Sequence, residues 1–124
     1  MLHDLIDTLK SMLKTINTPS SQDDWITWAG NQGTHILLGM VLSSFIGPTM
    51  SCLIYIFGKE MRDVVKGKGT IADSLTDSFY FGTGAWVIFA IMAGSSVPAS
   101  LSIAFVFLAF GAFIRAHLDN LTFR

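Results

Sequence analysis

Five residues in this sequence have side chains that could bind a cation or move a proton: His35, Glu60, Asp63, Asp73 and Asp77. Carboxylates are the ligands that calcium and magnesium prefer, and histidine acts as a base or a metal ligand near neutral pH. Glu60 and Asp63 are three residues apart, and Asp73 and Asp77 are four apart, so each pair shares a helix face. If all five converge, we expect a polar site for a divalent cation or a phospholipid-type headgroup.

The same residues also have purely structural interpretations. Thr70 followed by Asp73 resembles a helix-capping box. Glu60 and Asp63 could pair with the basic residues around them at a solvated helix end, and His35 could be a hydrogen-bonded helix-end residue. The sequence has no strong metal-ligand spacing, nucleophile elbow or phosphate-binding loop. Whether the protein is an enzyme therefore stays open.

The composition indicates a membrane protein. Charged residues make up 14% of the chain and hydrophobic residues 51%, with a mean hydropathy of +0.53, whereas a soluble domain carries roughly a quarter charged residues. The net charge is −1 without a long basic run, which gives no footprint for nucleic acid. One cysteine, Cys52, excludes an intrachain disulfide. The expected class is an all-α, polytopic membrane helical bundle.

The second half of the chain predicts two membrane helices. No charged residue occurs from Ser78 to Ile114, which is too long for one span of about 20 residues. Glycine, serines and proline between Gly94 and Pro98 supply a turn. The two helices are expected at about 77–93 and 99–115. We expect helices and not strands, because apolar and polar residues do not alternate and because a helix satisfies its own backbone hydrogen bonds in lipid.

The first apolar run, His35 to Gly58, has two interpretations. It could be one Pro48-kinked span, which gives three spans in the chain. A stripe of small residues then favours close helix packing or a homo-oligomer: Gly39, Ser43, Gly47 and Ser51. Alternatively, Gly47 and Pro48 form a turn between helices at about 29–46 and 48–66, because proline suits the first position of a helix.

The hairpin alternative gives four spans and draws a set of polar residues toward membrane depth: Asn31, Gln32, His35, Lys59, Glu60, Arg62 and Asp63. Such burial is costly unless the residues are paired or functional. In this arrangement every basic residue falls on one side: Lys10, Lys14, Lys59, Arg62, Lys66, Lys68, Arg115 and Arg124. The positive-inside rule makes that side cytoplasmic and favours four spans over three.

The N-terminal part precedes this transmembrane domain of residues 29–124. Apolar residues recur at helical spacing between charges over residues 1–17, which predicts an amphipathic helix at the membrane surface or against the protein. Residues 18–28 are expected to be a linker, with Trp25 and Trp28 as interfacial anchors.

The order of polar motifs resembles the VanZ-like group of small bacterial and phage membrane proteins. The matching features are His35 with Gly39, the run 58–63 that contains Glu60, the run 69–77 with its two aspartates, and Gly84. The resemblance covers about two fifths of the chain. It implies a helix hairpin before Glu60 and a polar cluster at the cytoplasmic membrane face.

Two functions follow from these patterns. In the first, a VanZ-like protein of the bacterial inner membrane, with both termini cytoplasmic, binds a divalent cation or a lipid headgroup through the acidic and histidine cluster. In the second, the chain is a non-enzymatic assembly: a homo-oligomer, a holin-like phage pore former or an accessory subunit of other membrane proteins. In both cases we expect the protein to lie in the lipid bilayer.

Overall fold

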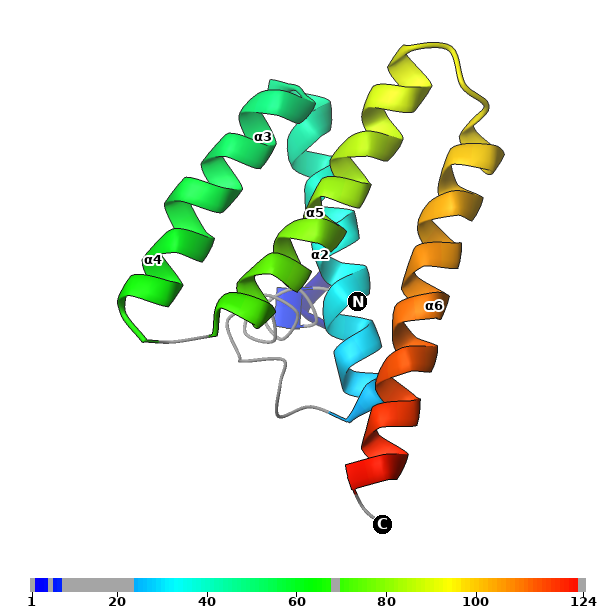
Figure 1. The fold of residues 1–124 in the computed structure, drawn as a ribbon. Coiled ribbons are helices and arrows are strands. Elements are labelled where there is room, and N and C mark those ends of the chain that lie inside the picture. Colours follow the sequence, from blue (N-terminus) through cyan, green and yellow to red (C-terminus); the bar gives the residue numbers. More distant parts are fainter. Residues whose placement is uncertain (1, 5, 8–23, 68–69, 123–124) are drawn as a thin grey trace.

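The computed structural model describes residues 2–4, 6–7, 24–67 and 70–122, and no β-strand occurs in these ranges. In chain order the helices are α2 (Trp25–Ile46), α3 (Pro48–Tyr55), the π-helix η2 (Ile56–Glu60), α4 (Met61–Val65), α5 (Ile71–Met92) and α6 (Val97–Thr122). α3, η2 and α4 are continuous and form one rod, the α3–α4 rod, which lies beside α2 and α5, with α6 on the opposite side of these two helices (Figure 1). The predicted all-α class is confirmed for this part of the chain.

The chain reverses direction at Gly47, between α2 and α3. Gly47 has a φ of 88°, which glycine adopts without steric cost, and its N–H donates to the Ser43 carbonyl at 2.9 Å. Pro48 is the first residue of α3, where its missing N–H is not needed. The segment is therefore a hairpin of two helices and not one kinked helix.

The other helix ends differ from the predicted ones for local reasons. α2 begins at Trp25 because Asp24 caps it, accepting a hydrogen bond from the Thr27 amide at 2.7 Å that lowers the pKa of Asp24. α5 begins at Ile71, six residues before the predicted start, because Thr70 accepts from the Asp73 amide at 3.1 Å. α6 continues past residue 115. Charge ends an apolar span, but it does not end a helix.

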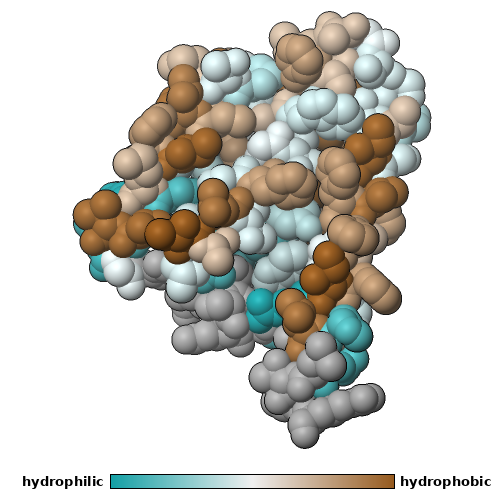
Figure 2. Space-filling model, viewed as in Figure 1, coloured by the Kyte–Doolittle hydropathy of each residue, from teal (hydrophilic) through white to brown (hydrophobic). Residues whose placement is uncertain are grey.

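Two helices in the described part of the chain are long and apolar enough to cross a membrane: Ile71–Met92 and Val97–Leu118. Phe105, Phe110 and Phe113 of α6 are exposed, and hydrophobic residues cover much of the face in Figure 2. The turns at 46–48 and 93–96 lie at one end of the molecule and contain no charge. The end of α4, the start of α5 and the end of α6 lie at the other end (Figure 1).

Most of the predicted N-terminal helix lies outside the described residues. Residues 2–4 and 6–7 are helical, and the His3 Nδ1 atom is 2.9 Å from Asp7 Oδ2. The remainder of residues 1–17, and the predicted linker up to residue 23, are not described. The amphipathic surface helix stays a prediction.

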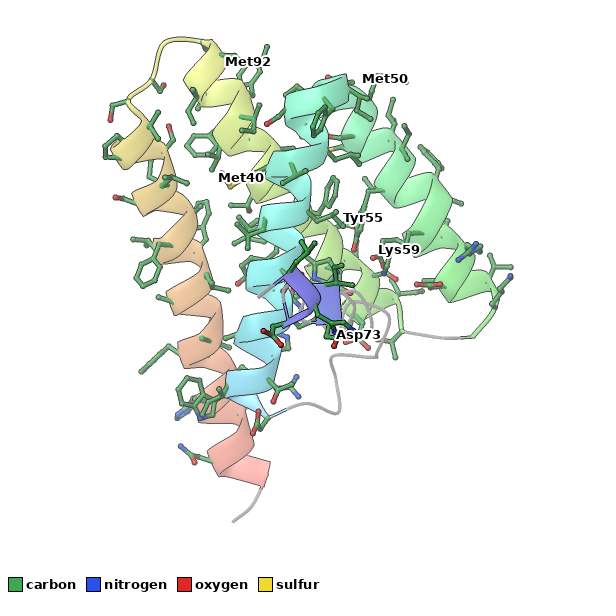
Figure 3. All side chains as sticks on the ribbon, turned by 180° about the vertical axis from the view of Figure 1, so that it is seen from behind. Met40, Met50, Tyr55, Lys59, Asp73 and Met92 are labelled. Atoms are coloured by element: carbon green, nitrogen blue, oxygen red, sulfur yellow. The ribbon has the colours of Figure 1, made fainter. Side chains whose placement is uncertain are left out.

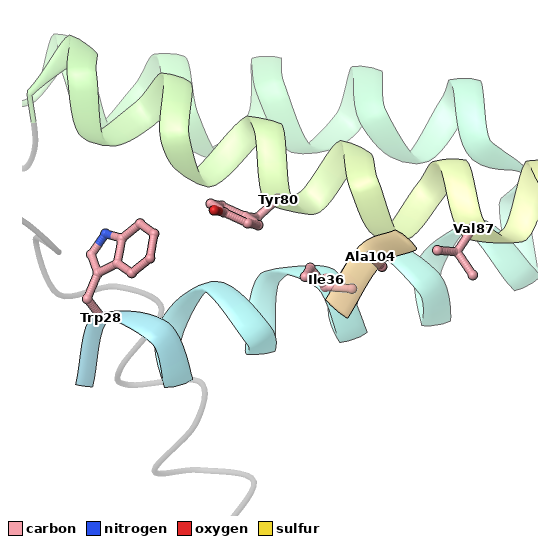
Figure 4. Packing of buried hydrophobic residues seen from close by; sticks show 5 residues of the cluster. All are labelled: Trp28, Ile36, Tyr80, Val87 and Ala104. Atoms are coloured by element: carbon pink, nitrogen blue, oxygen red, sulfur yellow. The ribbon is translucent and has the colours of Figure 1, made fainter. Parts of the chain in front are cut away.

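The core lies where α2, α5 and α6 meet, and is formed by Trp28, Ile36, Tyr80, Val87 and Ala104 (Figure 4). Trp28 is buried, with its ring edge-on to Tyr80 at 5.7 Å. The prediction of Trp28 as an interfacial anchor is therefore wrong, because its ring packs inside the bundle. Trp25 remains exposed.

Two glycines bring the backbones of α2 and α5 into direct contact. A Cβ added at Gly39 would lie 2.2 Å from the Phe81 carbonyl oxygen, and one added at Gly84 would lie 2.0 Å from the Ile36 oxygen. Only glycine allows this separation, as at other close helix crossings in membranes. Gly39 and Gly84 therefore fix the spacing between α2 and α5.

The small-residue stripe makes its contacts within the chain. Gly39 faces α5, and Gly47 forms the turn. Ser43 and Ser51 are buried, and their hydroxyl oxygens are 2.6 Å apart across the hairpin. These side chains stabilise the monomer fold. A homo-oligomer through the stripe stays a prediction, and these buried atoms do not contribute to it.

Candidate functional site

Three of the five predicted site residues converge inside the bundle. His35 of α2, Glu60 of η2 and Asp77 of α5 each offer one ligand atom, and these atoms lie within 4.8 Å of one another. The exposed fractions are 0% for His35, 4% for Glu60 and 6% for Asp77. This group, called the cation site below, could hold a metal ion.

The glycine contact between α2 and α5 explains why two of these residues meet. His35 lies one helical turn before Gly39, and Asp77 lies about two turns before Gly84, so both share the face of their glycine. Because the backbones touch at the glycines, short side chains one or two turns away can reach each other. The His35 Nε2 atom is 3.6 Å from Asp77 Oδ2.

The π-helix η2 brings the third residue into place. The Met61 N–H donates to the Ile56 carbonyl, five residues earlier, which is the hydrogen-bond pattern of a π turn. Tyr55 and Glu60 are also five residues apart, and the buried Tyr55 hydroxyl donates to Glu60 Oε1. The wide turn therefore positions the Glu60 carboxylate. Single π turns inside α-helices are frequent at functional sites.

Tyr55 forms one side of the cation site. Its ring stacks on Phe81 with centroids 4.0 Å apart and meets the His35 ring edge-on at 5.9 Å. Tyr55 and Lys59 both extend from the α3–α4 rod toward the middle of the bundle (Figure 3). These contacts hold Tyr55 in one position and exclude water from that side.

Only one basic side chain contacts the carboxylates of the cation site among the described residues. Lys59 Nζ is 3.1 Å from Glu60 Oε1 and is shared with Asp63 at 3.4 Å. Asp77 instead accepts a hydrogen bond from Gln32 Nε2 at 2.8 Å. The Lys59 ammonium is therefore shared by Glu60 and Asp63, and the buried Asp77 carboxylate has no lysine or arginine against it among the described residues. The interior has an excess of negative charge, which is costly unless a cation or a proton neutralises it.

The hydrogen bonds of His35 leave one ring nitrogen directed at a carboxylate. His35 Nδ1 lies 2.8 Å from the Asn31 carbonyl oxygen, and a carbonyl only accepts, so Nδ1 carries the hydrogen. In a neutral ring, Nε2 then presents a lone pair. At 3.6 Å it has no hydrogen-bond partner in the described part of the chain. Two acceptor atoms that face each other need a cation or a proton between them.

Further polar atoms on the same turn of α2 lack hydrogen-bond partners among the described residues. They are Asn31 Nδ2, Asn31 Oδ1 and Gln32 Oε1, and both residues are 0% exposed. A buried polar group without a partner costs about 1 to 3 kcal/mol. Their position beside His35 indicates a place where a bound group supplies the missing partners.

The other two predicted site residues lie outside the cation site. Asp63 is one turn beyond Glu60, paired with Lys59, and Asp73 lies in the first turn of α5 after the Thr70 cap. Tyr55 and the contact between Gln32 and Asp77 were not predicted from the sequence. A tyrosine in an apolar run five residues before a glutamate was the available signal for Tyr55.

No protein-family model, curated protein or solved structure matches this chain. The resemblance to the VanZ-like group therefore stays a prediction.

Proposed function

We propose that this chain is a multi-pass membrane protein whose cation site binds one divalent transition-metal ion. The observation that carries the proposal is the unpartnered His35 Nε2 atom, fully buried and 3.6 Å from Asp77 Oδ2, with Glu60 completing the group. One cation accounts for the facing acceptor atoms and for the excess of buried carboxylate at the same time.

The ligand types favour particular metals. Imidazole nitrogen suits zinc, iron, nickel and copper, while carboxylate oxygen suits manganese, magnesium and calcium. One nitrogen with two oxygens therefore favours Zn²⁺ or Mn²⁺ over the all-oxygen ions. Ligands at about 2.0–2.1 Å from one tetrahedral zinc are about 3.4 Å apart. His35 Nε2 and Asp77 Oδ2, at 3.6 Å, are already close to this separation, and the widest pair of the group, within 4.8 Å, would have to contract by up to about 1.4 Å.

A metal with three protein ligands keeps an open coordination position. Sites of this kind bind water or another oxygen ligand at the open position, whereas structural zinc sites are closed by four protein ligands. The Gln32 amide donates to Asp77 of the site, and its Oε1 atom, which has no partner in the described part of the chain, can accept a hydrogen bond from a ligand there. The cation site is thus suited to binding a small polar group inside a membrane protein.

Metal content of conservative variants tests this function. The protein purified in dodecyl maltoside should bind about one equivalent of Zn²⁺ or Mn²⁺, measured by equilibrium dialysis and elemental analysis. His35→Gln, Glu60→Gln and Asp77→Asn should each lower the affinity at least tenfold, because each removes a ligand. Asp63→Asn is the matched control, since Asp63 contacts Lys59 without joining the site. Equal binding by all four variants would refute the proposal.

The proposed membrane arrangement has four spans, formed by α2, the α3–α4 rod, α5 and α6, with the charged end and both termini on the cytoplasmic side of a bacterial inner membrane. The uncharged turn at Gly47 is then extracytoplasmic. A cysteine at the exposed Thr49, in a Cys52→Ala background, should react with a membrane-impermeant thiol reagent in intact cells. Protection of that cysteine, with labelling of one placed at Trp25, would favour three spans.

The alternative function, a pore or accessory subunit, receives no specific support. Small size, few membrane crossings and charge on one side fit many membrane proteins equally, and the residues of the small-residue stripe make contacts within one chain.

A further inference from the structure

An apolar groove leads from the surface of the bundle to the cation site. It runs between the α3–α4 rod and α5, with a volume of about 260 Å³. Most of its lining is apolar: Ile56, Met61, Val64, Val65, Ile71 and Leu75. Glu60, Ser74 and Ser78 are its polar lining residues, so one of the three ligands of the cation site borders the groove.

The groove opens sideways, toward the lipid in the proposed membrane arrangement. Val65 is 82% exposed, and Ile71 and Leu75 are each 67% exposed. Apolar side chains form most of its lining, and the buried Glu60 carboxylate lies among them. The occupant must therefore have an apolar chain and a polar head. One turn of a helix with its side chains occupies roughly 400 Å³, more than the groove holds, whereas a stretch of single alkyl chain occupies less.

The Glu60 carboxylate in the lining calls for an oxygen-bearing head on a bound cation. A metal held by three protein ligands has an open position for an oxygen ligand. Lys59 beside Glu60 adds a positive charge. A cation and an ammonium together favour a phosphate oxygen.

We propose that the groove holds one acyl chain of a membrane phospholipid, and that an oxygen of the lipid phosphate binds the metal of the cation site. This inference rests on the proposed metal binding and names the ligand of the same site. The chain supplies affinity by burial in the groove, and the metal selects the phosphate.

Hyperfine spectroscopy tests for direct contact between metal and phosphate. The protein in dodecyl maltoside is loaded with one equivalent of Mn²⁺, phosphatidylglycerol is added, and ³¹P coupling to Mn²⁺ is recorded by electron–nuclear double resonance. We expect a ³¹P coupling with the lipid and none with glycerophosphoglycerol, which has the same head without chains. The Glu60→Gln/Asp77→Asn double variant gives the background from Mn²⁺ on the micelle surface.

Variants that fill the groove separate lipid binding from metal binding. Val64→Trp should reduce phosphatidylglycerol affinity at least tenfold while Mn²⁺ affinity changes less than twofold. Leu75→Trp, at a more exposed lining position, should do the same if Val64→Trp impairs folding. Val41→Trp is the matched control, because Val41 is exposed on α2 and does not line the groove.

The outcomes distinguish the two proposals. Stoichiometric Mn²⁺ without ³¹P coupling above background overturns the lipid ligand and leaves the cation site intact. Equal coupling with glycerophosphoglycerol, or undiminished coupling in both groove-filling variants, shows that no acyl chain occupies the groove and also overturns it. Failure to bind Mn²⁺ or Zn²⁺ at all overturns both proposals.

Discussion

The interface between α2 and α5 and the interface between α5 and α6 hold helices together in opposite ways. At the first, Gly39 and Gly84 bring backbone onto backbone, with buried polar side chains beside the contact. At the second, side chains separate the helices. The candidate span of α5 is 44% buried and that of α6 only 11%. The tight interface fixes the positions of ligand atoms, and the loose one mainly adds apolar surface.

The largest effect is expected for Gly84→Ala, which separates the two backbones of the tight interface. The new Cβ would lie 2.0 Å from the Ile36 carbonyl oxygen, and backbone cannot move aside as a side chain can. We expect destabilisation of about 3 kcal/mol or more, at the upper end for overpacking, together with loss of metal binding. Unfolding in mixed dodecyl maltoside and SDS micelles, followed by circular dichroism, measures it.

Gly82→Ala is the control for that prediction. It lies on the same helix, and nothing is within 4 Å of a Cβ built there. Because alanine favours helix by about 1 kcal/mol over glycine, this variant should be neutral or slightly more stable. If Gly82→Ala and Gly84→Ala were equally harmful, the cost would arise from helix propensity and not from the close crossing.

An intermediate effect is expected at the loose interface, for Gly111→Ala. The added Cβ would lie 1.9 Å from the Tyr80 hydroxyl oxygen and 2.8 Å from a Trp28 ring atom, both on side chains that can shift. We expect about 1 to 2 kcal/mol of destabilisation, with metal affinity retained. Retained metal affinity would distinguish Gly111→Ala from Gly84→Ala, which should lose metal binding.

Tyr80 supplies a rescue test for the same contact. The Tyr80 hydroxyl donates to the Phe107 carbonyl at 3.0 Å, so Tyr80→Phe alone should cost about 1 kcal/mol. In the Gly111→Ala/Tyr80→Phe double variant the closest clash is gone. The destabilisation of the double variant should therefore be smaller than the sum of the two single-variant values by at least about 0.5 kcal/mol. Strict additivity would mean that the hydroxyl does not limit the approach of α6.

The smallest effect is expected for Ser43→Ala, in the hairpin contact between α2 and α3. It removes the 2.6 Å contact with Ser51, whose hydroxyl still donates to the Pro48 carbonyl at 3.0 Å. Polar contacts of this kind average about 0.6 kcal/mol in membrane helices. Ser44→Ala is the matched control, because exposed Ser44 bonds only its own helix at Met40. Indistinguishable unfolding curves for the two variants would show that the contact between Ser43 and Ser51 does not stabilise the fold.

Features set by local chemistry were predictable from the sequence. The glycine and serines from residue 94 predicted the second turn directly. Gly47 with Pro48 left a kink and a turn open, and the placement of the basic residues favoured the turn that the structure has. Thr70 caps α5, as its spacing to Asp73 indicated. His35, Glu60 and Asp77 were among the five residues selected because their side chains could bind a cation.

Features that depend on helix rotation were not predictable. Asp63 and Asp73 have the same chemistry as their neighbours, and only the packing of the rods directs them away from the cation site. Trp28 suits an interface and a core equally well, so its burial against Tyr80 needed the position of α5. The Gly39–Gly84 contact pairs residues far apart in the chain, which spacing along a single helix does not reveal.

The π turn at Ile56–Glu60 also affects how related sites should be recognised. A π turn is equivalent to one extra residue inserted in a helix, so Tyr55 and Glu60, five positions apart, behave as neighbours one turn apart. A chain without the insertion would place the same pair four positions apart on a regular α-helix. An alignment that includes this tyrosine–glutamate pair must therefore allow a one-residue gap within the α3–α4 rod. Without that gap, a homologous site would be scored as absent.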